Sequence, residues 1–372
     1  MIPRLYSKDQ DPDASNGYGF LNGCSSCITT EERNGEYYAE LKVLPRDRLY
    51  AAIIPGMLIK LKANHKDPPQ VFEITNNPVD KTGVMKITAN HIKSYFYNNY
   101  TRPSYFATRN YRLSGTAAEV VAALAANPLL LRNQNVSISG FDNTEKELDI
   151  DFSSPVSFED VYLGDGGFID TFGGEFHYDN DNIEILASRG SDFDKIVRYG
   201  SGISDYSQEM NNNGVYTQLY GYAKLSDDNG NLYVLDNRID TGAGSDLFYQ
   251  RVLVKDYTDA FSSKNYDPSD YQTQELIKRK IYTKLLNYKT AKLAQLTEPS
   301  VNIRITLNAE LMKLKNIGLC DTVKVLYSST GAVVRKKVIK TVYDGLNEKY
   351  VEMEMGDKRI SLSSFLKKSN WR

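Results

Sequence analysis

Cysteine is scarce in this sequence. Only three occur in 372 residues, namely Cys24, Cys27 and Cys320. This number is too small for a disulfide-stapled scaffold and indicates folding in a reducing cytosol. Cys24-Ser-Ser-Cys27 is a single CxxC without the second pair of a zinc ribbon, and it precedes β structure rather than opening a helix. We interpret these residues as incidental thiols, with a structural metal as a minor alternative.

Histidine is equally rare, which limits the chemistry available. The three histidines are His65, His91 and His177, far apart and without an H-E-x-x-H motif. A zinc hydrolase needs two or three such ligands at helical or strand spacing. The sequence also lacks G-x-S-x-G, and "LGDGGFIDTFGG" has neither a phosphate-loop lysine nor a G-x-G-x-x-G context. Paired glycosidase carboxylates have no positive signal. We predict no catalytic, cofactor-binding or metal-binding residues.

The sequence has neither a large excess of charge of one sign nor a long apolar run. The 45 basic and 47 acidic residues are mixed along the chain and give a net charge of −2. No basic stripe of the kind that duplex binding needs is visible. No run approaches ~18 apolar residues, so no membrane anchor is predicted. "MIPRLYSKDQ" has no apolar core, so no secretory signal is expected.

What is abundant is tyrosine, with 27 residues against 14 phenylalanines. Tyrosine favours half-buried strands and protein interfaces. The length predicts two to four domains, and 41% apolar residues are ample for their cores. Residues 36–90 predict consecutive strands; in "EYYAELKV" the alternation puts Tyr37, Ala39, Leu41 and Val43 on one face. A small barrel or sandwich is expected there.

Two helices and further strands are predicted beyond residue 100. "SGTAAEVVAALAAN" is a helix that Ser114 or Thr116 can cap. A second helix starts at Ser269, capped with Gln272 and closed by Pro299. Its buried stripe is expected to be Ile277, Ile281, Leu285 and Tyr288, with a solvated lysine-rich face opposite. Short strands are expected at "NVSIS", "ELDIDFSS" and "VNIRITL", and a hairpin around "DNGN".

The end of the chain echoes its beginning. At an offset of 264 positions, Ile59-Lys60-Leu61 matches Val323-Lys324-Val325. At the same offset Ile74 matches Val338, Asp80 matches Asp344, and Ile87 matches Val351. A gap-free match at several points makes a duplicated β-barrel a reasonable hypothesis.

The most acidic stretch is "GGEFHYDNDNIEILASRGSDFDKIVRYG", residues 173–200. As a calcium loop it fails, because Ile183, Glu184 and Gly190 stand where a ligand, a turn glycine and a bidentate glutamate are needed. "EFHY" and "IEIL" instead predict two strands joined by the polar turn "DNDN". We interpret the stretch as a hairpin.

Four stretches together resemble the baseplate-hub or tail-tip-hub proteins of tailed bacteriophages and prophages, also known as the tail endopeptidase or the N-terminal region of the tail-associated lysin. They are "NGEYYAELKV" with "IKLKA…PPQVFEITNNPVDKTGVMKITANHI", the block from "LGDGGFIDTFGGEFHY" to "NNNGVYTQLYGYAK", "EPSVNIRITL", and "LCDTVKVLYSSTG…VVRKKVIKTVYDGLNEKYVEMEMG". At Cys320 the family more often has glycine. Because "KRISLSSFLKKSNWR" follows soon after the second barrel, we expect no lytic domain of the kind that longer relatives carry.

The resemblance implies a β-rich α+β fold with two tube-like β-barrels. Its expected divisions are a first barrel over residues 1–100, an α+β domain over 101–187, a second barrel over 188–226 and 301–356, an inserted segment with a long amphipathic helix over 227–300, and a C-terminal tail over 357–372. Three chains would then present six barrels, an adaptor between threefold and sixfold symmetry.

The function that the resemblance implies is that of a structural, non-enzymatic hub. It would form a homotrimer at the virion tail tip, assembled in the bacterial cytoplasm. Its partners would be the distal tail protein, the tape-measure protein and fibre or receptor-binding proteins, with DNA passing through without sequence-specific binding. One alternative is a peptidoglycan-degrading tail lysin, for which His177 and Glu175 would be the first residues to mutate. A second is a receptor- or glycan-binding tail module.

Overall fold

The computed structural model describes most of the chain, in nine segments. These are residues 1–126, 135–199, 202–211, 214–243, 250–262, 266–297, 300–307, 317–326 and 333–356. The chain divides into two compact units. Unit 1 comprises Met1–Ile92, Gly190–Met210 and Val301–Arg372, and unit 2 comprises Lys93–Arg189 and Asn211–Ser300. The predicted tail over residues 357–372 lies outside the described residues.

Unit 1 begins with a half-sheet of short antiparallel strands. Its elements are β1 (Arg4–Tyr6), β2 (Gly19–Phe20), β3 (Cys24–Glu32), β4 (Tyr37–Val43), β5 (Leu58–Leu61), β6 (Gln70–Asn76) and β7 (Met85–His91), with a 3-10 turn at Tyr50–Ala52. In β4 the residues predicted to share a face, from Tyr37 to Val43, are buried at every second position. Leu41 stands opposite Ile87 of β7. The period-two pattern therefore gave both the strand and its buried face.

The second half-sheet is built from strands at the other end of the chain. Its elements are β13 (Asp192–Tyr199), β14 (Gly202–Asn211), β18 (Ser300–Leu307), β19 (Thr322–Leu326), β20 (Val333–Asp344) and β21 (Lys349–Met355). The hydrogen-bonded order is β19-β13-β14-β18-β21-β20, and β19 also pairs with β20. The order of the second half-sheet is therefore closed, because the strands at its two ends, β19 and β20, also pair with each other.

The two half-sheets share one strand order. In the first half-sheet the order of neighbouring strands, read from β3, is β3-β4-β7-β6-β5. In the second half-sheet the corresponding strands follow in the same order, β14-β18-β21-β20-β19. The internal echo falls on matching strands, because Ile59 and Val323 lie in β5 and β19, and Ile74 and Val338 lie in β6 and β20. The next strand differs, since β1 is antiparallel to β5 whereas β13 is parallel to β19.

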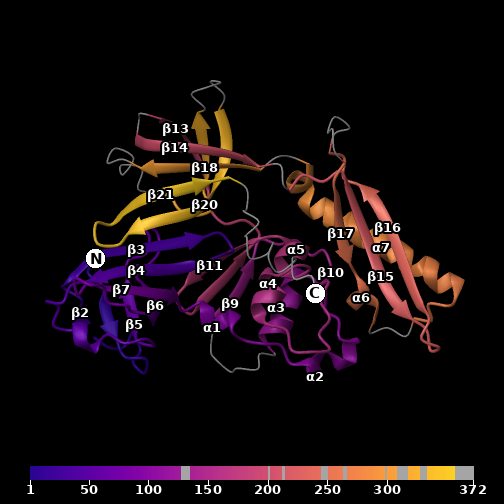
Figure 1. Cartoon of the computed structure of the whole chain (residues 1–372), viewed down its shortest axis with the longest axis horizontal. Coiled ribbons are helices and arrows are strands. Elements are labelled where there is room, and N and C mark those ends of the chain that lie inside the picture. Colours follow the sequence, from indigo (N-terminus) through magenta and orange to yellow (C-terminus); the bar gives the residue numbers. More distant parts are fainter. Residues whose placement is uncertain are drawn as a thin grey trace. The chain divides into compact units, whose positions relative to one another are not determined.

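Together the half-sheets form one curled, thirteen-stranded sheet within the described residues (Figure 1). The β-rich fold predicted from the sequence is confirmed, although no strand pairing among the described residues closes the first half-sheet into a tube. The long connection between β14 and β18 corresponds to the tight β3–β4 turn at Arg33–Glu36. Unit 2 is thus partly an insertion into a β-hairpin position of the second half-sheet.

The first part of unit 2 mixes short helices and strands. Its elements are α1 (Ser94–Tyr97), α2 (Pro103–Phe106), a 3-10 turn at Ala107–Arg109, β8 (Ser114–Gly115), α3 (Ala117–Ala125), β9 (Asn135–Ser139), β10 (Lys146–Glu147), α4 (Phe158–Leu163), α5 (Phe168–Phe172), β11 (Glu175–Asp179) and β12 (Asn182–Leu186). Of the two predicted caps, Thr116 is the one that caps α3, and it forms a capping box with Glu119. The expected strand over "ELDIDFSS" is wrong beyond Glu147: Leu148 and Phe152 are buried from an irregular segment that hydrogen-bonds to Leu113 and Tyr111.

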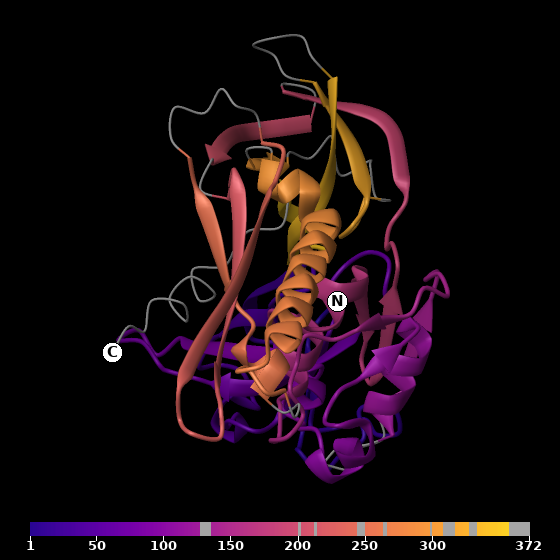
Figure 2. The ribbon, with the colours of Figure 1, turned by 90° about the vertical axis from the view of Figure 1, so that its right-hand side faces the viewer.

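The second part of unit 2 is a three-stranded sheet covered by one long helix. The strands β15 (Gln218–Ser226), β16 (Leu232–Asp240) and β17 (Val252–Asp256) are ordered β16-β15-β17, and α6 (Thr258–Ser262) and α7 (Tyr271–Thr297) follow. Figure 2 shows α7 lying along this sheet. The domain boundaries inferred from the resemblance stay a prediction; β15, counted there with the second barrel, pairs here with β16 and β17.

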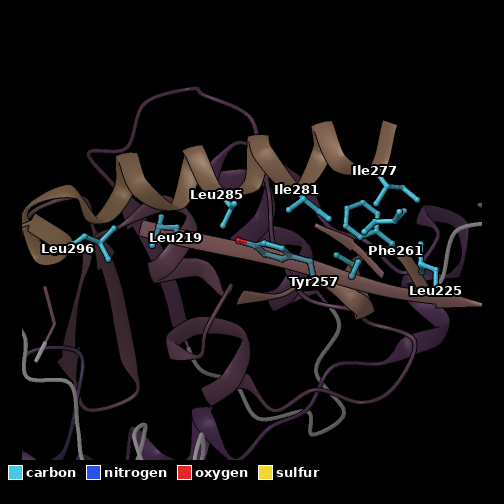
Figure 3. Packing of buried hydrophobic residues seen from close by; sticks show 11 residues of the cluster. Leu219, Leu225, Tyr257, Phe261, Ile277, Ile281, Leu285 and Leu296 are labelled. Atoms are coloured by element: carbon cyan, nitrogen blue, oxygen red, sulfur yellow. The ribbon is translucent and has the colours of Figure 1, made fainter. Parts of the chain in front are cut away.

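The core beneath α7 contains the predicted helical stripe. Ile277, Ile281 and Leu285 are fully buried and point toward Leu219 and Tyr257, as Figure 3 shows. Gly221 of β15 lets the helix approach, because a Cβ there would lie 2.9 Å from Ile281 Cγ2. The stripe is therefore confirmed as a packing surface at these three residues, and Tyr288, its fourth predicted member, is partly buried against the same core.

Two details of α7 differ from the prediction. Asp270, not Ser269, caps it, since Asp270 Oδ2 accepts the Thr273 amide at 2.8 Å. The lysine-rich face is only partly solvated, because Lys284 pairs with Asp149 at 2.6 Å and Lys292 with Asp170 at 2.7 Å. These partners come from the first part of unit 2, so a helical pattern alone did not reveal them.

Candidate assembly interface

The two half-sheets meet where β20 pairs with β3, and we call this pairing the junction. It is antiparallel and joins Lys340–Asp344 to Ile28–Glu32. Figure 1 shows yellow β20 beside indigo β3. Thr29, Thr341 and Tyr343 are buried there, and Thr29 Oγ1 donates to the Ala63 carbonyl at 2.8 Å. Strand edges that would otherwise expose unpaired backbone groups satisfy each other at the junction.

A buried carboxylate ties both half-sheets together beside the junction. Asp321 is 1% exposed, and one oxygen accepts Lys66 Nζ at 2.6 Å and the Gly318 amide at 2.7 Å. The other oxygen accepts the Ser191 amide at 2.9 Å. A buried carboxylate is tolerated when its lone pairs are satisfied by a cation and by backbone donors. Lys66 follows β5, whereas Ser191 and Asp321 precede β13 and β19.

A second ion pair lies on the junction itself. Lys340 Nζ contacts Glu32 Oε1 at 2.8 Å. Partial burial acts to lower the pKa of the Lys340 ammonium, but the hydrogen bond and charge of Glu32 outweigh it and raise that pKa. His65 lies edge-on to Tyr343 and Tyr350, with ring centroids 5.1 and 5.3 Å apart. Polar and aromatic contacts therefore reinforce the backbone pairing.

The acidic stretch that first suggested chemistry is the predicted hairpin. β11 and β12 pair antiparallel from Glu175↔Leu186 to Asp179↔Asn182, and Asn180 turns with φ 53°. His177 Nδ1 and Glu184 Oε2 lie 2.7 Å apart, and Glu175 accepts the Arg189 amide at 2.7 Å. These contacts are cross-strand and turn contacts, the ordinary stabilisation of a hairpin.

The structure keeps the three histidines apart in separate local settings. His91 is buried, stacks on Tyr37 at 4.4 Å, and its Nε2 lies 3.0 Å from Gln70 Oε1. His65 belongs to the junction and His177 to the hairpin of unit 2. In the described segments, no group of three or more His, Cys, Asp or Glu side chains is arranged to hold a metal ion.

The cysteines are free thiols with different surroundings. Cys24 and Cys27 lie in β3, where burial raises the pKa of Cys24 to about 11 and that of Cys27 further. Cys320 has φ 67°, the left-handed conformation that favours glycine. The sequence position where the resembled family more often has glycine is thus a left-handed turn, and here a cysteine occupies it.

Sequence reasoning missed Asp321, Lys66, Glu32 and Lys340. The two ion pairs join residues more than 250 positions apart, and neither strand periodicity nor capping patterns connect such residues. The only available signal was the internal echo, which relates the half-sheets without giving the contact between them. Among the described helices, none combines the length and apolar composition that crossing a bilayer requires.

Comparison with known proteins gives similarity of fold. No family model matches the chain, and no curated protein matches its sequence. Three solved structures are similar over nearly the whole chain. A prophage tail protein from Listeria monocytogenes has a TM-score of 0.58 at 14% identity, over 99% of this chain and 98% of its own. The 43 kDa tail protein of prophage MuSo2 from Shewanella oneidensis has 0.58 at 9%, over 96% and 98%.

The third is a tail protein from Neisseria meningitidis, with a TM-score of 0.55 at 9% identity, over 96% of each chain. At these identities the comparison shows the fold alone. The chain therefore shares the fold of prophage tail proteins.

Proposed function

We propose that this chain is a structural hub of a phage or prophage tail tip, acting as a trimeric adaptor that continues or closes the tail tube. The observation that carries the proposal is the junction. Two half-sheets with one strand order are joined edge to edge within a single chain. A chain with that internal repeat provides two similar modules to a ring, and three chains provide six.

The internal repeat also identifies the edges that would join neighbouring chains. At the 264-position offset, Lys340–Asp344 of the junction corresponds to Asn76–Asp80, which continues from β6. Val79 in that segment bridges to Met85 on one side and is 53% exposed. On the other half-sheet, β14 corresponds to β3, and among the described residues its pairing with β13 involves only Gly202 and Ile203. We infer that Asn76–Asp80 of one chain lies against β14 of the next, repeating the junction between protomers.

The proposed hub works mechanically and not as an enzyme. Its partners would be the distal tail protein above, the tape-measure protein and DNA within the lumen, and fibre or receptor-binding proteins at its periphery. Mixed charge, 45 basic against 47 acidic residues, suits a lumen through which a phosphate backbone slides. The site of action would be the virion tail tip, after assembly in the host cytoplasm.

Native mass spectrometry of the chain, alone and mixed with the distal tail protein of the same phage, tests this proposal. We expect trimers in the mixture. Val79→Asp should abolish them, because it introduces a charge at the inter-chain edge. Val254→Asp is the matched control, since Val254 is 55% exposed in unit 2, and it should leave the trimer intact. Persistent monomers of the native chain in the mixture would contradict the hub.

The lysin alternative makes a separate prediction. A suspension of host cell walls should not lose turbidity on incubation with the purified chain. Lysis that disappears in both Glu175→Gln and His177→Ala would replace the structural proposal with an enzymatic one.

A further inference from the structure

β16 is the terminal strand of the three-stranded sheet in unit 2. The order β16-β15-β17 leaves one side of β16 without a neighbouring strand in the part of the chain that the structure describes. Every second backbone N–H and C=O of a terminal strand points away from its only partner. Such an edge is a template for a further strand unless something covers it.

A groove runs beside this edge, between β16 and α7, and we call it the edge groove. It has a volume of about 330 Å³. Its lining residues are Gln218, Arg238, Ile239, Asp240, Tyr282, Leu286 and Lys289. One wall is formed by the end of β16 together with Gln218 of the neighbouring β15, and the other wall is formed by α7.

The helix wall carries a second apolar stripe in addition to the one buried in the core. Tyr282 and Leu286 lie four residues apart, so they share one side of α7. They are 45% and 42% exposed. A helix that only covers the sheet needs one apolar stripe; the exposed second stripe offers apolar contacts to side chains on alternate positions of an added strand.

Positive charge predominates in the edge groove. Its lining residues include two cations, Arg238 and Lys289, and one carboxylate, Asp240. Asp240 is already engaged, because its Oδ1 accepts a hydrogen bond from the Gln218 side-chain Nε2 at 3.2 Å, and its backbone carbonyl accepts one from Lys289 Nζ at 2.9 Å. Nearby Lys278 is paired with Glu275 at 3.0 Å and adds little. The groove therefore favours a ligand with negative charge.

We propose that the edge groove binds an extended, acidic segment of another tail protein, with apolar residues at alternate positions, as a fourth strand on β16. The nine residues of β16 provide roughly 30 Å of edge for backbone hydrogen bonds. The exposed stripe of α7 and the cations Arg238 and Lys289 select the side chains. The inference depends on the proposed hub function only for the source of the segment, a second protein of the same tail.

Hydrogen exchange measured by mass spectrometry tests the proposal, on the purified chain and on tail particles from cells that carry it. In particles, the exchange rate of the outward amides of β16 should be about one tenth of their rate in the free chain, or lower. β17 is the matched control, since it is the opposite terminal strand of the same sheet. Its exchange should be unchanged.

Charge reversal tests the selectivity. Arg238→Glu with Lys289→Glu should remove the added protection of β16, whereas Lys224→Glu, on an exposed residue of β15 outside the groove, should not. Cross-links from Lys289 should reach a different protein of the tail.

Three outcomes would overturn the proposal. β16 amides already protected in the free chain would mean that the chain covers its own edge. Cross-links from Lys289 to a second copy of this chain would assign the groove to self-pairing. Particles that contain the chain but leave β16 unprotected would exclude strand addition while leaving the hub intact. Absence of the chain from tail particles would instead contradict the proposed function, and with it the source of the segment.

Discussion

Lys66 and Asp321 are 255 positions apart in the chain, yet their side chains meet at 2.6 Å. Asp321 is 1% exposed and Lys66 43%, so the contact joins a buried anion to a cation at the surface. It connects the loop after β5 to the turn before β19, the strand that corresponds to β5 in the other half-sheet. The ion pair therefore locks the two repeats of unit 1 to each other.

Asp321→Asn should destabilise unit 1 by about 2–4 kcal/mol, because it leaves Lys66 and two backbone amides without their carboxylate. Chemical denaturation would measure the change. Asp13→Asn is the control: Asp13 pairs with Lys60 but is 74% exposed, and its removal should cost less than about 0.5 kcal/mol. Equal effects of the two substitutions would refute a structural role for the buried pair.

Gly190→Ala should cost more than Gly230→Ala, although the two glycines have similar φ values of 86° and 83°. A Cβ at Gly190 would lie 2.3 Å from the Cys320 carbonyl oxygen, whereas nothing lies within 4 Å at Gly230. The backbone strain alone should cost about 1 kcal/mol at either position, and the clash should at least double that at Gly190. Thermal unfolding of both variants gives the comparison, and a difference near zero would disprove the close approach.

Ile281→Ala should destabilise unit 2 by about 2–5 kcal/mol, because it opens a cavity in the core beneath α7. Tyr282→Ala changes the next residue, which is 45% exposed, and should cost less than about 1 kcal/mol. Both values come from denaturant titration. A larger loss for Tyr282→Ala would mean that the wrong stripe of α7 had been assigned to the core.

The Cys24 thiol should react slowly at neutral pH. Burial raises its pKa to about 11, so at pH 8 its thiolate fraction is on the order of 10⁻³. Alkylation by iodoacetamide, followed by mass spectrometry, should be roughly 100-fold slower in the folded chain than in the denatured one.

The raised pKa of Cys24 also makes the stability of the folded chain depend on pH. The folded state holds this proton more tightly, so the contribution is complete below the unfolded pKa of about 8.5 and is lost as the pH rises toward about 11. Cys24→Ser should weaken that alkaline loss. Alkylation of native Cys24 at the denatured rate would rule out the buried thiol.

Local patterns in the sequence predicted local structure well. Alternation gave the buried face of Tyr37–Val43, the acidic run gave the β11–β12 hairpin, and helical spacing gave Ile277, Ile281 and Leu285. Each of these depends on neighbours within a few residues, where periodicity is fixed by backbone geometry.

Contacts between distant segments were not predictable in the same way. Asp270 caps α7, where Ser269 was predicted. Lysines on the face that was predicted to be solvated form ion pairs with Asp149 and Asp170. The "ELDIDFSS" strand did not form beyond Glu147 because tertiary contacts of Leu148 and Phe152 overrode the alternation. The junction between β3 and β20 is of this distant kind, and it carries the proposed function.

Electron cryo-microscopy of tail tips from particles that contain this chain tests the central claim most directly. The account predicts three copies around the tail axis, presenting six half-sheets in alternation, with Asn76–Asp80 of each chain against β14 of the next. Six copies, a single copy, or three copies joined through unit 2 with the edges of unit 1 unpaired would contradict it.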